Sequence, residues 1–196
     1  LKYKTCQLIR TKLTDYNGRY AFLHLEAGTY LLYVIPGEKD RNYYLPTYYV
    51  RQLDWEAAHP ITISGDAFRV DISLVQQPVS INNTGSVSGF VFYQDTLARK
   101  TALLNRTERV PAEGIPVFLQ FEGEIVAWTL SKDDGSFSFN ELTYGQYNVI
   151  AQKPGYVMEK TASISLTEDA DACHNVVILI GNGKINSWLN NNWVEL

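Results

Sequence analysis

Two stretches of the sequence, DYNGRYAFLHLEAGTYLL over Asp15–Leu32 and KDDGSFSFNELTYGQYNV over Lys132–Val149, share one pattern. Subtracting 117 from the second numbering aligns them. Seven positions then carry matched residues: Gly18 with Gly135, Tyr20 with Phe137, Phe22 with Phe139, Leu25 with Leu142, Gly28 with Gly145, Tyr30 with Tyr147 and Leu32 with Val149. Matches this dense at one offset indicate an internal duplication, so the chain is predicted to contain two copies of one structural unit.

Each copy has the pattern of a β-hairpin. Asn17-Gly18 and Asp134-Gly135 are dipeptides that accept positive φ and make tight turns. Aromatic residues two positions apart then place both rings on one face of a strand. The next glycine permits a second turn into another alternating strand. Because an isolated hairpin is marginal in water, a second sheet is expected to cover the aromatic face.

Around the second copy, residues 86–181 predict a complete β-sandwich. Seven short segments with strand-like patterns are separated by turn signals, as is typical of such a fold. They are Ser86–Tyr93, Ile115–Phe121, Ile125–Leu130, two hairpin strands within Ser136–Val149, Thr161–Leu166 and Asn175–Ile180. The polar stretch Gln94–Pro111 is predicted to be a loop.

Around the first copy, residues 1–77 predict a sandwich without its N-terminal strands. Only seventeen residues precede Gly18, which leaves room for one strand, Thr5–Thr14, and not for a Val-x-Gly-x-Val strand and its partner. This unit is therefore predicted to be truncated at its N-terminus or to borrow its missing strand. Ala58–Ile63 and Phe68–Leu74 are predicted as its last strands.

The remaining segments are a linker and a tail. Residues 78–85 are short and polar, and they are predicted to link the two domains. Residues 182–196 fit neither copy, and they are predicted either to begin a following module or to pack against the second domain. With no start methionine or signal peptide, the chain is expected to be processed or to be a piece of a longer protein.

The composition favours β-structure and argues against several classes of protein. Hydrophobic residues make up 45% and charged residues 19%, and there are 13 Tyr, 8 Phe and 4 Trp against 1 Met. A net charge of −4 argues against a nucleic-acid partner or an anionic-membrane surface. No apolar run approaches the roughly 20 residues that span a bilayer, so no membrane-spanning segment is expected. The predicted fold class is all-β, with two tandem antiparallel β-sandwiches.

The repeated motif, Thr/Asp-x-x-Gly-x-Tyr/Phe-x-Phe-x-x-Leu-x-x-Gly-x-Tyr-x-Leu/Val, resembles that of carboxypeptidase regulatory-like modules, which are relatives of the Cna protein B-type repeats. The second copy adds the Val-x-Gly-x-Val and Ile-Pro-Val-x-Leu elements of that pattern. The resemblance covers Thr14–Leu32 and Ser86–Ile180, and it implies a transthyretin-like (prealbumin-like) β-sandwich. The stretch Tyr44–Tyr49, with Trp55, looks like versions found in large secreted proteins of Bacteroidetes-type bacteria.

The resemblance implies a role outside the cell or on its surface. Such modules mostly act as stalks, spacers or adhesion units attached to other domains. Some of them carry a self-formed Lys–Asn isopeptide bond between their first and last strands. The first strand of the second copy, Val87–Tyr93, has no lysine to pair with Asn175, so no isopeptide bond is predicted.

No constellation of catalytic or metal-binding residues stands out, so no enzyme activity and no cofactor are predicted. His24, His59 and His174 have no second histidine three to five residues away, which argues against zinc. No nucleophile elbow, P-loop or dinucleotide fingerprint is present. Asp133-Asp134 and Glu168–Asp171 have oxygen ligands that calcium accepts, but they lack EF-hand spacing, and solvated acidic loops are the other interpretation.

An aromatic run in the first domain is the sharpest candidate site. It contains Tyr43, Tyr44, Tyr48, Tyr49 and Trp55. Exposed planar rings stack on sugars and anchor protein partners, which makes Tyr48, Tyr49 and Trp55 candidate ligand contacts. The other interpretation is that these rings cover the edge of the core. Their exposure to solvent distinguishes the two.

Two smaller features complete the prediction. Thr96, in Asp95-Thr96-Leu97, resembles a short O-glycosylation acceptor of Bacteroidetes. Cys6 and Cys173 have no metal-ligand or redox spacing, which leaves a long-range disulfide and two buried thiols as alternatives.

The predicted function is that of a non-catalytic structural, spacer or adhesion module of a secreted or surface-attached bacterial protein. Its partners are then other domains of the same polypeptide. The alternative is a module that binds a glycan or a surface protein through the aromatic residues of the first domain.

Overall fold

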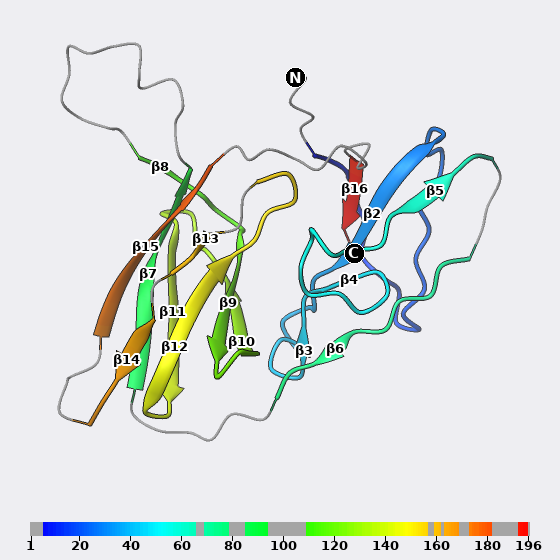
Figure 1. Cartoon of the computed structure of the whole chain (residues 1–196). Coiled ribbons are helices and arrows are strands. Elements are labelled where there is room, and N and C mark those ends of the chain that lie inside the picture. Colours follow the sequence, from blue (N-terminus) through cyan, green and yellow to red (C-terminus); the bar gives the residue numbers. More distant parts are fainter. Residues whose placement is uncertain are drawn as a thin grey trace, which may run out of the picture. The chain divides into compact units, whose positions relative to one another are not determined.

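The computed structural model describes residues 6–65, 69–78, 85–93, 109–156, 159–161, 163–168, 173–181 and 192–195. Within these residues the chain consists of strands, turns and loops and has no helix, as the composition predicted (Figure 1). It divides into two compact units. Unit 1 contains residues 1–76 and 184–196, and unit 2 contains residues 77–183.

Unit 2 is a β-sandwich of two sheets. One has the order β10-β9-β12-β13, with β14 also pairing with β12, and the other has the order β11-β7-β15, with β8 also pairing with β7. The bounds are β7 (Gly85–Tyr93), β8 (Val110–Pro111), β9 (Pro116–Phe121), β10 (Glu124–Leu130), β11 (Ser136–Leu142), β12 (Gly145–Ala151), β13 (Glu159–Lys160), β14 (Ile164–Leu166) and β15 (Cys173–Ile180). The β7–β15 pair is parallel, which departs from the wholly antiparallel arrangement expected.

The aromatic face of the second hairpin lies in the core of unit 2, as the alternation predicted. Phe137 and Phe139 on β11 are only 3% and 6% exposed, in one cluster with Val87 and Val91 on β7. A side chain at Gly89 is excluded, because a Cβ there would lie 2.8 Å from Cζ of Phe137. Gly89 of β7 therefore lies opposite Phe137 of β11, where the absence of a side chain leaves room for the ring.

Unit 1 is built around a central strand, β2 (Gly28–Val34). Its main sheet has the order β1-β16-β2-β4, with β5 also pairing with β2, while β3 and β6 form a two-stranded sheet. The bounds are β1 (Gln7–Thr11), β3 (Tyr44–Leu45), β4 (Thr47–Tyr48), β5 (Ile61–Ile63), β6 (Val75–Gln76) and β16 (Asn192–Glu195). Strand β2 is buried on both faces, with Tyr30 and Leu32 on one and Leu31 and Tyr33 on the other.

The hairpin turns of the two units are made by the same hydrogen bonds. In unit 1 the Gly18 N–H donates to the carbonyl oxygen of Asp15 at 2.9 Å, and in unit 2 the Gly135 N–H donates to that of Lys132 at 2.9 Å. Both glycines have positive φ, 73° and 81°. The offset of 117 that aligns the sequences therefore also aligns the turns.

The residues after these turns also correspond. The Tyr30 hydroxyl donates to the Glu26 carbonyl oxygen at 2.8 Å, and the Tyr147 hydroxyl donates to that of Thr143 at 2.9 Å. The two hairpin ring pairs meet edge to face with centroids 5.9 Å and 6.0 Å apart, Tyr20 with Phe22 and Phe137 with Phe139. The duplication read from the sequence is therefore a duplication of structure.

In unit 1, β16 occupies the place that β9 has in unit 2. The offset makes β1 the counterpart of β10 and β2 the counterpart of β12. Strand β9 lies between β10 and β12, and β16 lies between β1 and β2 (Figure 1). However, β9 is antiparallel to both neighbours, whereas β16 is parallel to both, so β16 runs in the reverse direction.

The register of β16 also follows that of β9. Asn192 pairs with Gln7 and Tyr30, while Phe121 pairs with their counterparts Glu124 and Tyr147. The β1–β16 ladder shifts register between Leu8 and Arg10, and the β10–β9 ladder shifts at the corresponding place, between Ile125 and Ala127. Strand β16 thus fills the position of β9 residue for residue.

This pairing matches neither of the roles expected for residues 182–196. The described part of that tail, β16, belongs to the sheet of unit 1 rather than to a following module or to the second domain. It supplies a strand of the kind that unit 1 was expected to borrow. A four-residue strand that pairs in parallel with a segment more than 150 residues earlier leaves no local pattern in the sequence.

Two segments of unit 1 that were predicted as strands are not strands. They are Tyr20–Leu25 after the hairpin turn and Phe68–Leu74, of which residues 69–74 are described. At the offset of 117, Tyr20–Leu25 corresponds to β11. Strand β5 pairs with β2 at Gly28 and Tyr30 as β14 pairs with β12 at Gly145 and Tyr147, so residues 69–74, which follow β5, correspond to β15, which follows β14. Both β11 and β15 pair with β7. No described strand of unit 1 takes the place of β7, so both segments lack the neighbour that would make them strands.

Candidate functional site

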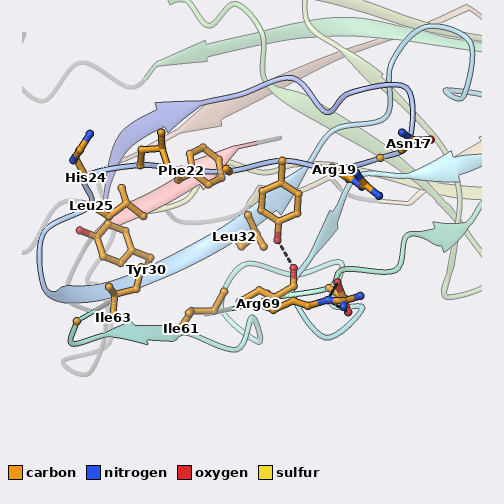
Figure 2. Close-up of a pocket in the computed structure, with 17 residues that line it drawn as sticks. Asn17, Arg19, Phe22, His24, Leu25, Tyr30, Leu32, Ile61, Ile63 and Arg69 are labelled. Atoms are coloured by element: carbon orange, nitrogen blue, oxygen red, sulfur yellow. Dashed lines mark hydrogen bonds and ion pairs between the residues drawn. The ribbon is translucent and has the colours of Figure 1, made fainter. Parts of the chain in front are cut away.

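A groove lies over one face of β2 in unit 1. Its volume is about 1010 Å³, at the upper end of the range for small-molecule sites. One wall is residues 17–25, and the other includes Ile61, Ile63 and residues 69–71. Tyr30 and Leu32 of β2 lie between them (Figure 2). The groove is therefore bounded by extended backbone on both sides and has an apolar floor.

The walls are bridged by one hydrogen bond. The Tyr20 hydroxyl donates to the carbonyl oxygen of Val70 at 2.6 Å (Figure 2). Partial burial of the phenol, with smaller effects of Asp71 and Tyr49, raises the pKa of Tyr20. The hydroxyl therefore stays protonated and remains a donor well above neutral pH.

The polar groups of the groove do not form a catalytic arrangement. Arg69 and Asp71 make an exposed ion pair with Nε to Oδ1 at 3.0 Å, and His24 lines the opposite wall. The lining contains no serine, threonine or cysteine. In the described part of the chain, no three His, Cys, Asp or Glu side chains gather as metal ligands would. Between these polar groups the lining is mostly apolar, with Phe22, Leu25, Leu32, Ile61 and Ile63 among its side chains.

The aromatic run does not form the exposed ligand surface predicted for it. Tyr48 is 0% exposed and Trp55 is 3% exposed, and the Tyr48 ring stacks on Tyr33 with centroids 4.1 Å apart. Tyr49 is half-buried and packs against the cluster of Tyr30 and Leu32. Tyr48 therefore belongs to the core on the Tyr33 side of β2, which faces away from the groove, and Trp55 is also buried. The prediction of ligand contact is thus wrong for Tyr48 and Trp55.

The other members of the run lie at the surface. Tyr43 is 63% exposed and Tyr44 is 38% exposed. They precede the continuously buried residues Leu45–Tyr48 of the same insert, so only the later part of the run lies in the core.

The acidic pair Asp133-Asp134 is engaged in the second hairpin turn. Oδ1 of Asp134 accepts a hydrogen bond from the Ser136 N–H at 2.8 Å, and Oδ1 of Asp133 accepts one from the Asp134 N–H at 2.9 Å. The bonds to Ser136 lower the pKa of Asp134. This is the geometry of a turn cap, in which each carboxylate accepts a hydrogen bond from a backbone N–H.

The remaining predicted sites are partly or wholly outside the described residues. Thr96 and residues 169–171 lie outside them. Cys6 is a free thiol whose pKa is raised to about 12 by burial, whereas the side chain of Cys173 is not described.

The groove residues were predicted as core, and their exposure was missed. Tyr20, Phe22 and Leu25 carry the same pattern as the buried Phe137, Phe139 and Leu142, and the pattern alone cannot show that the covering strand is absent. The local sequence pattern therefore gives no signal for the groove.

Comparison with known proteins places the chain among β-sandwich modules. A family model described as the second β-sandwich domain of BOS complex subunit NOMO1-like proteins matches residues 100–180. The chain is 25% identical over 173 residues to serine-aspartate repeat-containing protein D of Staphylococcus aureus strain MW2, and 27% identical over 173 residues to protein E of strain Newman. Both matches cover 88% of the chain, but only 12% and 14% of the relatives' lengths.

Solved structures with a partly similar backbone include an enzyme and a pilin. Klebsiella pneumoniae 5-hydroxyisourate hydrolase has a TM-score of 0.36 at 19% identity, covering 50% of this chain and 91% of its own. The major pilin subunit BcpA of Bacillus cereus has a TM-score of 0.38 at 14% identity, covering 57% and 33%. The class defined by the fold is that of all-β proteins built from β-sandwich units. Among the described residues there is no helix long and apolar enough to cross a membrane.

Proposed function

We propose that this chain is a non-catalytic structural module, a spacer or adhesion unit of a secreted or surface-attached bacterial protein. The observation that carries the proposal is the tandem duplication of one sandwich unit, with turns and tyrosine hydrogen bonds repeated at an offset of 117. Repetition of a compact unit extends a polypeptide without adding chemistry. The partners are then the other domains of the same polypeptide.

Two further observations support this proposal. The matched segment is only 12% and 14% of the length of its relatives in Staphylococcus aureus, as expected for one part of a modular protein. The lining of the groove of unit 1 contains no serine, threonine or cysteine that could act as a nucleophile. Within this class, the motif of the two hairpins favours the carboxypeptidase regulatory-like and Cna B-type modules of Bacteroidetes-type secreted proteins.

A replacement experiment tests the spacer role. In the full-length protein, residues 1–196 are deleted or are exchanged for an unrelated pair of β-sandwich domains of similar length. A spacer predicts that deletion impairs the function of the neighbouring domains and that the unrelated pair restores it. Loss of function with the unrelated pair would contradict a spacer and would indicate specific binding by this chain.

The second candidate function is binding through the exposed end of the aromatic insert. Tyr43, at 63% exposed, and Tyr44 present ring surface that Tyr48 and Trp55 do not. Such rings stack on sugars or anchor a protein partner. A glycan array and a pull-down with the wild-type chain and with Tyr43→Ala test this role. Binding that is lost in Tyr43→Ala supports it, and the absence of any bound glycan or protein argues against it.

A further inference from the structure

The groove of unit 1 lies where unit 2 has a strand. In unit 2, β7 lies between β11 and β15 and pairs with both. The counterparts of β11 and β15 in unit 1 are residues 19–25 and 69–74, and these two segments form opposite walls of the groove. The groove thus corresponds to the position of β7.

The burial of matched residues supports this correspondence. On β11, Phe137, Phe139 and Leu142 are buried beneath a core that includes Val87 and Val91 of β7. Their counterparts Tyr20, Phe22 and Leu25 are only partly buried and line the groove (Figure 2). A strand in the groove would cover the apolar face that is exposed in unit 1.

The bond that bridges the walls occupies a backbone acceptor of one wall. In unit 2 the corresponding wall, β15, pairs with β7 through its backbone. In unit 1 the carbonyl of Val70, on the corresponding wall, accepts instead from the Tyr20 hydroxyl. A side-chain hydroxyl has therefore taken over a backbone acceptor, and it is free to rotate away when a backbone N–H replaces it.

Unit 1 already accepts a strand that is distant in sequence. Strand β16 fills the position of β9 in matching register, although its direction is reversed. The scaffold of β1 and β2 is therefore compatible with completion by an added strand, the mode of recognition known as β-augmentation.

We propose that the groove of unit 1 is a strand-acceptor site for one extended segment of a partner polypeptide, with the Val-x-Gly-x-Val pattern of β7. The chain contains this pattern once, at Val87–Val91, and there it already forms the centre of a sheet in unit 2. By analogy with β7, the segment runs antiparallel to residues 19–25 and parallel to residues 69–74. Its glycine faces Tyr20, and its valines cover the floor. This role goes beyond that of a spacer and does not depend on it.

Peptide binding to the whole chain tests the proposal. The probe is a fluorescent peptide with the sequence of Gly85–Tyr93, flanked by lysines for solubility, and its affinity is measured by anisotropy. The matched control peptide carries Gly89→Val. Because a Cβ at Gly89 approaches the ring of Phe137 to 2.8 Å in unit 2, we expect this peptide to bind at least about tenfold more weakly.

Variants and hydrogen exchange locate the bound peptide. Phe22→Asp, on the groove wall, is expected to abolish binding, whereas Tyr16→Ala, at a residue 96% exposed outside the lining, is expected to bind as the wild type does. Hydrogen exchange is measured on the wild-type chain, so this test does not depend on a variant that folds. Amide exchange in residues 19–25 and 69–74 should slow when the peptide is added. Three results would overturn the proposal: no binding, equal binding of both peptides, or protection that appears in unit 2 instead. Dimerisation of the chain that blocks the peptide would also overturn it, because a second copy would then be the occupant.

Discussion

Val194 lies opposite Leu32 in a parallel ladder, in the position that Leu119 holds opposite Val149 in unit 2. The two ladders match in register and differ in direction. A strand of either direction can fill this position between two neighbours, because parallel and antiparallel pairing both satisfy the backbone hydrogen bonds of those neighbours. Unit 1 is therefore a sandwich whose sheet is completed by a strand from the other end of the chain.

Breaking the β16 ladder is expected to destabilise unit 1 alone. Val194→Pro removes a backbone N–H from a strand with neighbours on both sides, so we expect a loss of about 2–4 kcal/mol in the free energy of unfolding of unit 1. Urea unfolding followed by hydrogen exchange resolves the two units. Unit 2 is the internal control, and an equal loss in both units would argue against the pairing.

Truncating a buried ring of the aromatic insert is expected to affect stability and not binding. Trp55→Ala should cost about 3–5 kcal/mol, because the side chain is 3% exposed in the core. Tyr43→Ala is the matched control, since Tyr43 is 63% exposed, and it should change stability by less than about 0.5 kcal/mol. Thermal unfolding of the two variants checks this order. A Trp55→Ala chain as stable as the wild type would refute the burial of this ring.

The hydrogen bond between Tyr20 and Val70 predicts that the stability of unit 1 falls as the pH becomes alkaline. The pKa of Tyr20 is raised in the folded chain, so its contribution to stability is present below the ordinary tyrosine pKa near 10 and is lost as the pH rises through the folded value. We expect the wild type to lose more stability than Tyr20→Phe between pH 8 and pH 11. At pH 8, Tyr20→Phe should itself cost about 0.5–1.5 kcal/mol for the lost hydrogen bond.

Tyr16→Phe is the control for this pH series, because Tyr16 is 96% exposed. Its stability should follow that of the wild type at each pH. If Tyr20→Phe and the wild type lost stability in parallel, the proposed role of the Tyr20 hydroxyl would be incorrect.

The thiol of Cys6 is expected to react slowly in the folded chain. Burial raises its pKa to about 12, which leaves little thiolate at pH 8. In a Cys173→Ser background, alkylation by iodoacetamide at pH 8 should be at least about 100-fold slower than in the urea-unfolded chain. The readout is the intact mass against time. Comparable rates in the two states would show that Cys6 is not buried.

The sequence predicts most of unit 2 and only part of unit 1. In unit 2 the turn at Gly135, the rings of Phe137 and Phe139 and the strand Ser86–Tyr93 follow local rules of turn chemistry and alternation, and each is confirmed. In unit 1 the same rules apply to Tyr20 and Phe22, but their strand depends on a neighbour that local sequence does not supply. Local β-propensity therefore predicts strands correctly where all the neighbouring strands of the sheet are present.

The candidate site, too, could be predicted only in part from the sequence. The aromatic run was recognised from composition, but whether Tyr48 and Trp55 face solvent depends on β2, whose second face they cover. The groove was not predicted as a site, since its lining has the pattern of a core. Both the burial of these rings and the exposure of the groove depend on which distant segments of the chain pack together, and local sequence does not show this.

The central claim is that β16 completes the main sheet of unit 1. Its most direct test is to compare hydrogen exchange in the whole chain with that in a chain that ends at Asn191. Strand β1 pairs with β16 alone, so its amides depend on that strand. We expect residues 7–11 to be protected in the whole chain and to exchange rapidly in the shortened one, with β9 and β12 of unit 2 unchanged. Equal protection of residues 7–11 in both chains would contradict the completion of unit 1 by β16.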